Sequence, residues 1–175
     1  MATTFVPIAT VTVGSGGTAS ITFSSIPQTY TDLCLFISAR SEVAGNFSDE
    51  IIKLNNTTTS YTNRYIYGNG SSANPGSNAY TSLGGFSAGM PGDTATASTF
   101  GNKMIYIPNY AGSNYKSFSK DGVTENNASE AFAELNALLW SSTDAIRSIG
   151  INVYGGGGNF AQYSTFHLYG IKAEL

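Results

Sequence analysis

The stretch of sequence that decides the fold is FGNKMIYIPNYAGSNYKSFSKDGV, residues 100–123. Its first part, residues 100–107, has apolar residues on both faces of an extended chain, which is typical of a strand in the middle of a packed sheet. Pro108 removes a backbone donor and ends that strand, and residues 109–114 supply the glycine and asparagine of a turn. The chain then returns in a more polar alternation around Phe118, so the stretch predicts a β-hairpin.

Alternation of the same kind predicts further strands at residues 5–13, 19–23, 32–39, 50–54, 60–67, 146–154 and 163–173. The first two of these are joined by the glycine-rich residues 14–17, which predicts another hairpin. Residues 133–140 suit a helix or a strand, and we favour a strand because the neighbouring segments are strands. Eight to ten strands predict one all-β domain over residues 1–175, an antiparallel β-sandwich resembling a jelly roll.

Composition excludes several classes of protein. Only 11% of the 175 residues are charged and the net charge is −3, which argues against a nucleic-acid surface. The single Cys34 cannot form an internal disulfide, and its apolar surroundings predict a buried core residue. No secretory signal and no stretch of ~20 apolar residues is visible, so we expect no membrane contact and synthesis and folding in a cytoplasm.

The residues that commonly carry chemistry do not form a recognisable site. His167 is the only histidine, and no Gly-x-Ser-x-Gly sequence supplies a nucleophile for it. One histidine and one cysteine cannot complete a zinc site, and the acidic residues do not have the spacing of a calcium loop. We therefore expect no enzymatic activity, no metal and no cofactor, with His167 a half-buried strand residue.

A tyrosine-rich face is the main candidate for binding. Three tyrosines in residues 60–67 share one face of the predicted strand, where they could stack on sugar rings, contact a protein or simply pack across strands. Residues 65–92 then contain no charged residue, which suggests a functional loop or a hidden short strand. The predicted interface consists of Tyr61, Tyr65, Tyr67, Tyr80 and Phe86.

Several segments together resemble a known family. They are ATVTVGSGG (9–17), SIPQTYTDL (25–33), YIPNYAGS (106–113), TENNA (124–128), QYST (162–165) and LYGIK (168–172). In these segments the chain resembles small β-rich proteins common in tailed phages of aquatic bacteria, cyanophages among them. The resemblance covers nearly the whole chain and is weakest over residues 41–98. It implies a non-enzymatic capsid or tail component of the virion and transfers no binding residue.

Two roles follow from this resemblance. The first is a capsid decoration (cement) protein, a homo-oligomer and often a trimer, that binds the major capsid protein. The second is a tail-fibre or receptor-binding knob that contacts a glycan on the host surface. A fibre protein usually carries an N-terminal attachment segment, whereas the first predicted strand here begins within a few residues of Met1. We therefore expect the decoration protein.

Overall fold

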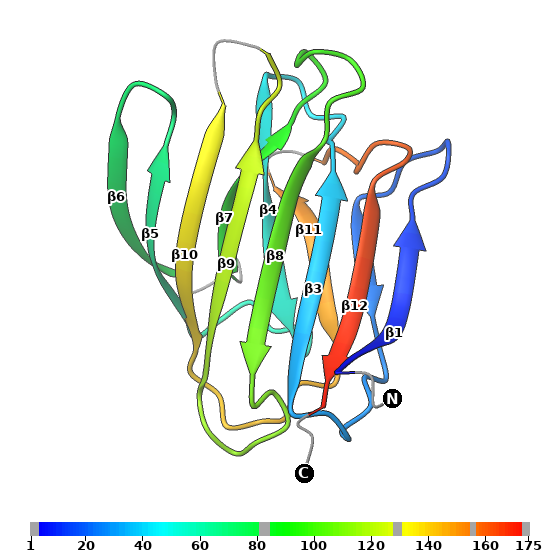
Figure 1. The fold of residues 1–175 in the computed structure, drawn as a ribbon, viewed down its shortest axis with the longest axis vertical. Helices are drawn as coiled ribbons and strands as arrows, with labels where there is room; N and C mark the ends of the chain where they lie inside the picture. Colours follow the sequence, from blue (N-terminus) through cyan, green and yellow to red (C-terminus); the bar gives the residue numbers. More distant parts are fainter. Residues whose placement is uncertain (1–3, 81–84, 128–130, 155–156, 173–175) are drawn as a thin grey trace.

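The computed structural model describes residues 4–80, 85–127, 131–154 and 157–172, with residues 80 and 85–88 described by their backbone alone. Twelve β-strands form two antiparallel sheets packed face to face, and no helix occurs in these residues (Figure 1). The prediction of an all-β antiparallel sandwich is confirmed. Within the same residues, no segment forms a helix that has the length and apolar character needed to cross a membrane.

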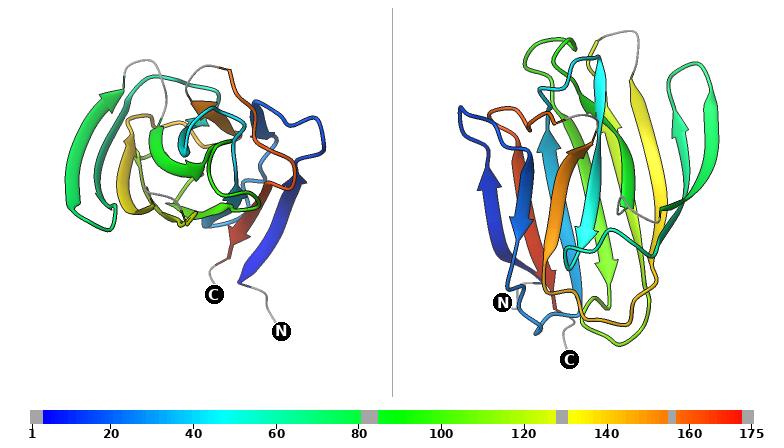
Figure 2. Two further views of the ribbon diagram at one scale, coloured as in Figure 1. Left: turned by 90° about the horizontal axis from the view of Figure 1, so that it is seen from above. Right: turned by 180° about the vertical axis from the view of Figure 1, so that it is seen from behind.

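The larger sheet has eight strands, and it lies in front of the smaller one in Figure 1. Its strands in spatial order are β1 (Phe5–Thr12), β12 (Thr165–Ile171), β3 (Asp32–Ala39), β8 (Gly101–Pro108), β9 (Lys116–Thr124), β10 (Phe132–Trp140), β5 (Tyr61–Gly68) and β6 (Ala73–Tyr80). The smaller sheet consists of β2 (Ser20–Phe23), β11 (Ile149–Tyr154), β4 (Phe47–Leu54) and β7 (Gly85–Pro91). Figure 2 shows the two layers from above and from behind.

The apolar core lies between the two sheets and follows from the two-residue period of the strands. Leu33, Leu35 and Ile37 of β3 alternate with outward residues and are buried. Aromatic rings form part of this core, with Phe160 and Phe166 edge to face at 4.9 Å between ring centres. Burial of each large apolar side chain stabilises the fold by about 1.5–3 kcal/mol.

The hairpin predicted at residues 100–123 is confirmed as β8 and β9, which pair from Asn102 opposite Val123 to Tyr106 opposite Ser119. Asn109 begins the turn with a φ of 48°, a left-handed conformation that asparagine tolerates better than most residues. The strand predicted at residues 133–140 is also confirmed, since β10 pairs with β9 on one side and β5 on the other.

The hairpin predicted from residues 5–13 and 19–23 is wrong. β1 pairs with β12 in the larger sheet, whereas β2 pairs with β11 in the smaller sheet. The glycine-rich link between them crosses from one sheet to the other, and Thr18 pairs with Phe160 on the way. Two alternating segments joined by a turn look alike in sequence whether they pair with each other or with distant strands.

The strand count of eight to ten was too low, because the charge-free residues 65–92 contain all of β6 and all of β7. The sequence of β6, ANPGSNAY, has no apolar alternation. It is an edge strand held by backbone pairing with β5 from Ala73 opposite Gly68 to Tyr80 opposite Tyr61. Backbone hydrogen bonds are independent of side-chain type, so the pattern of apolar residues gave no sign of this strand.

Arg40 organises the connection between β7 and β8. Its guanidinium donates hydrogen bonds to four backbone carbonyls, those of Asp93, Ala95, Thr96 and Thr99, at 2.8–3.3 Å. The planar fork of an arginine can satisfy several acceptors at once, which the single ammonium of a lysine cannot do in the same geometry. Arg40 therefore fixes this loop against the larger sheet.

Candidate interaction surface

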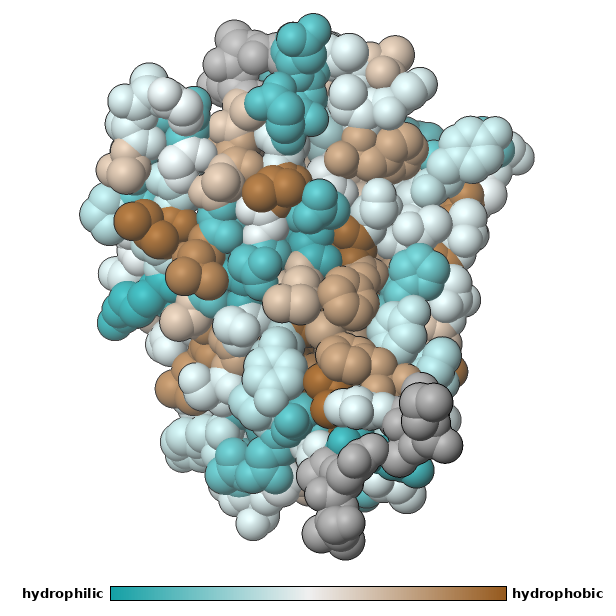
Figure 3. Space-filling model, viewed as in Figure 1, coloured by the Kyte–Doolittle hydropathy of each residue, from teal (hydrophilic) through white to brown (hydrophobic). Residues whose placement is uncertain are grey.

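The outer face of the larger sheet carries a continuous row of side chains. The strand register aligns one residue from each of six neighbouring strands in this outer row: His167 of β12, Phe36 of β3, Met104 of β8, Asp121 of β9, Leu135 of β10 and Ile66 of β5. Its four apolar members are 36–55% exposed, and Val123 beside the row is also exposed. Figure 3 shows brown patches among polar atoms on this face. A scattered exposed apolar residue is ordinary, but several on neighbouring strands indicate an interaction surface.

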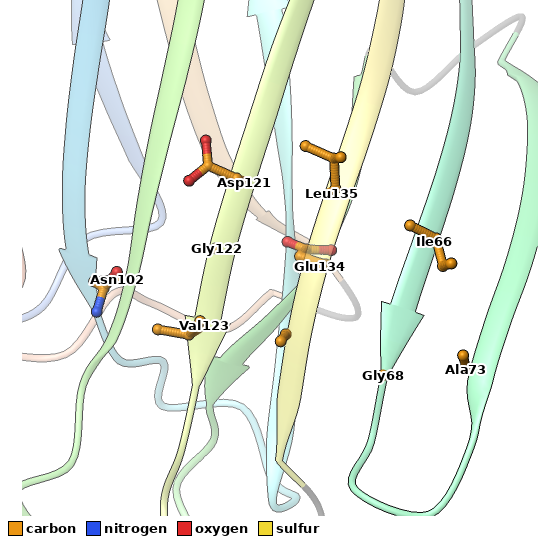
Figure 4. Close-up of a pocket in the computed structure, with 10 residues that line it drawn as sticks. Ile66, Gly68, Ala73, Asn102, Asp121, Gly122, Val123, Glu134 and Leu135 are labelled. Carbon is orange, nitrogen blue, oxygen red and sulfur yellow. The ribbon is translucent and has the colours of Figure 1, made fainter.

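Two shallow hollows open on the same face. One, of about 430 Å³, is lined by Phe36 and His167 among others. The second, of about 400 Å³, is lined by Leu135 and Val123 among others (Figure 4). Asp121 borders both hollows, so the surface combines apolar floors with a carboxylate between them. Such hollows can receive apolar side chains or a ring with polar groups at its rim.

A different polar arrangement lies between the sheets. Lys103 Nζ of β8 is 2.8 Å from Glu50 Oε1 of β4, so this ion pair joins the two sheets. Lys120 Nζ of β9 is 2.5 Å from Glu134 Oε1 of β10 within the larger sheet. All four residues are at most 9% exposed. A buried ion pair contributes little net stability, but removing one of its partners is strongly destabilising.

Burial shifts the pKa values of Asp49, which neighbours Glu50, and of Lys120, a member of the second ion pair. It raises the pKa of the Asp49 carboxyl from its ordinary 3.8 to about 6, although Lys103 and a hydrogen bond with the backbone of Gly89 act in the opposite direction. It lowers the pKa of the Lys120 ammonium from 10.5 to about 8, and the positive charge of Lys103 lowers it further, against Glu134. Shifted pKa values occur in functional sites, but a structural ion-pair cluster produces them equally well.

Tyr61, the first residue of the predicted interface, belongs to the core. It is 1% exposed, and its ring stacks on Trp140 with 6.3 Å between ring centres. Its hydroxyl accepts a hydrogen bond of 2.8 Å from the backbone N–H of Leu54. The interface prediction is therefore wrong for Tyr61, because its face of β5 turns toward the interior of the sandwich.

Tyr65 and Tyr67 follow Tyr61 on the inner face of β5 and are half-buried. Their rings stack with 6.2 Å between centres, and Tyr67 meets Phe132 edge to face at 5.7 Å. The first contact lies along β5 and the second crosses from β5 to β10, and an interface role for the two tyrosines stays a prediction.

The backbone of Tyr80 pairs with Tyr61, and that of Phe86 pairs with Ile51. The side chains of Tyr80 and Phe86 lie outside the description, so their role also stays a prediction.

The two isolated reactive residues lie where the sequence predicted. Cys34 is 2% exposed, and burial raises the pKa of its thiol to about 11, followed by a smaller effect of Asp121. His167 is a partly buried strand residue whose Nδ1 lies 3.1 Å from Thr10 Oγ1. Among the residues that the structure describes, no group of three or more His, Cys, Asp or Glu is placed to hold a metal ion.

The sequence does not predict the outer row. Apolar residues on both faces of residues 100–107 predict a strand covered on both sides. β8 is central in its sheet, but only its inner face is covered by the smaller sheet, and Met104 on the other face is exposed. The signal that could have found the row was the same second apolar face.

No protein-family model, no curated protein and no solved structure matches this chain. The resemblance to virion proteins of tailed phages therefore stays a prediction.

Proposed function

We propose that the protein is a non-enzymatic structural protein of a phage particle, a capsid decoration protein that binds the major capsid protein as a homo-oligomer. The observation that carries this proposal is the outer row, which exposes apolar side chains on β3, β8, β10 and β5. A stable protein keeps such a surface when another protein covers it in an assembly. The row extends across a broad face, which suits a protein partner better than a small ligand.

The strand order supports the same proposal at the level of the fold. With the pairs β5–β6 and β9–β10 set aside, β1, β3, β8 and β12 of the larger sheet alternate along the chain with β2, β4, β7 and β11 of the smaller sheet, except that β4 and β7 follow one another. We interpret these eight strands as a jelly roll that the two additional pairs widen on one side. Double-sheet jelly rolls are common in viral capsid and lectin domains, so this support is an analogy of fold.

Binding to capsids tests the proposal directly. Purified protein is mixed with phage particles whose own copy of the gene has been deleted, and the mixture is sedimented. We expect the protein to sediment with the capsids until a fixed ratio to capsid subunits is reached, and an antibody to label the shell in electron micrographs. Protein that stays in the supernatant at every concentration would refute the decoration role.

A receptor-binding knob is the second candidate, and one hollow of the outer face favours it. The ring of Phe36 with Asp121 and His167 around it offers stacking and hydrogen bonding to a sugar. On this account purified protein competes with phage for adsorption to host cells, and an antibody labels the tail. Replacement of Asp121 by alanine should then abolish the competition.

A further inference from the structure

The outer row contains an acid and a base that cannot meet within one copy of the chain. Asp121 and His167 stand three strands apart, and at about 4.8 Å per strand their backbones are about 14 Å apart. Met104 and Phe36 lie between them on β8 and β3. In spatial order this part of the row is therefore acid, apolar, apolar, base, a pattern that complements itself when one copy is reversed against another.

We propose that a second copy of the chain covers this face, through a two-fold axis that runs parallel to the strands between β3 and β8 and midway between the facing sheets. This operation places Asp121 of each copy opposite His167 of the other, and Phe36 opposite Met104. Each contact occurs twice, as an isologous interface requires. The aromatic ring and the thioether sulfur also make a favourable pair. The inference rests on the proposed function, in which the protein is a homo-oligomer, and it assigns the outer row to the contact between copies.

Other placements of the axis set the Asp121 carboxylate against a less favourable neighbour. An axis along the row sets Asp121 against Asp121 of the other copy, and like charges at close range disfavour association. An axis moved by one strand sets Asp121 against Met104, which buries a carboxylate without a partner. Among these placements, the arrangement in which Asp121 faces His167 gives each carboxylate a side chain that can donate a hydrogen bond to it.

The area of contact suits a stable pair. With this axis six strands from β1 to β10 overlap in the two copies. Six strands at about 4.8 Å and eight residues at about 3.3 Å make a face of about 29 by 26 Å, or about 750 Å² per copy. The two copies together bury about 1,500 Å², which lies in the usual range of specific interfaces, about 1,200–2,000 Å².

The mass of the full chain in solution, measured by light scattering during gel filtration, tests the inference. We expect twice the 18.4 kDa of one chain at high micromolar concentration. Phe36→Glu should weaken association by at least about tenfold, because each new carboxylate would be buried against Met104. Tyr154→Glu is the matched control: Tyr154 is 37% exposed against 38% for Phe36, but it lies on β11 of the other sheet, and its variant should still pair.

Exchange of the residues at positions 121 and 167 tests which strands of the two copies face each other. His167→Asp alone should weaken association, since it sets two carboxylates together, and the double variant His167→Asp with Asp121→His should restore it. Circular dichroism and thermal melting confirm that each variant is folded. A monomeric or trimeric wild-type protein overturns the inference, and so does a double variant no better than the single one. A dimer that fails to sediment with capsids would refute only the proposed function. A monomer that sediments with capsids would refute only the inference that a second copy covers this face.

Discussion

Replacement of Asp49 by asparagine should stabilise the protein at about pH 7. The pKa of the Asp49 carboxyl rises from 3.8 to about 6 on folding. At about 1.36 kcal/mol per pH unit, its ionisation in the folded state costs about 3 kcal/mol, and partial exposure reduces this to about 2–3 kcal/mol. Since the folded state binds the proton more tightly, the cost is fully present above pH 6 and disappears as the pH falls through 6 toward 3.8. Asparagine keeps an oxygen that can accept the hydrogen bond from the Gly89 backbone.

Urea unfolding followed by the fluorescence of Trp140, the only tryptophan, measures the effect. Asp49→Asn should raise the free energy of unfolding by about 2–3 kcal/mol at pH 7 and by little at about pH 4, where the wild-type carboxyl is protonated in the folded state. Asp144→Asn is the control, because Asp144 is exposed and its replacement should change little at either pH. A destabilised variant at pH 7, or equal stabilisation at both pH values, would refute the reasoning.

Three further substitutions test other parts of the fold. Lys120→Met should lower the free energy of unfolding by about 3–5 kcal/mol in urea, because it removes the ion-pair partner of buried Glu134, and adding Glu134→Leu should recover most of the loss. Arg40→Lys should cost about 1–3 kcal/mol and speed hydrogen exchange in the loop between β7 and β8, because one ammonium cannot replace the guanidinium fork. Gly92→Ala should lower the melting temperature and the free energy of unfolding by about 1–3 kcal/mol, because the added Cβ would overlap the backbone of a neighbouring loop. Gly14→Ala is the control, because its added Cβ would lie in open space and should leave the melting temperature unchanged.

Each of these has a result that contradicts it. A double variant at residues 120 and 134 as unstable as Lys120→Met would mean that the buried charge is not the cause. Unchanged hydrogen exchange in Arg40→Lys would mean that the loop between β7 and β8 does not depend on the guanidinium for its order. Equal melting temperatures of the two glycine variants would rule out the close approach at Gly92.

The sequence by itself determined where most strands lie and how their residues alternate. The hairpin of β8 and β9 and the strand β10 could be predicted because the two-residue period and the turn residues are local properties of the chain. The burial of Cys34 followed from its apolar neighbours in the same way. Local patterns failed for β6, whose polar sequence is held mainly by backbone pairing with β5.

Only the tertiary structure decided which strands are neighbours and which faces are covered. β1 finds its partner in β12 at the other end of the chain, so no local pattern could separate β1 from β2. The buried charges of Lys103 and Lys120 are tolerated because their carboxylate partners come from other strands. The outer row exists for the same reason: its six residues come from six strands, and only the register of the assembled sheet aligns them.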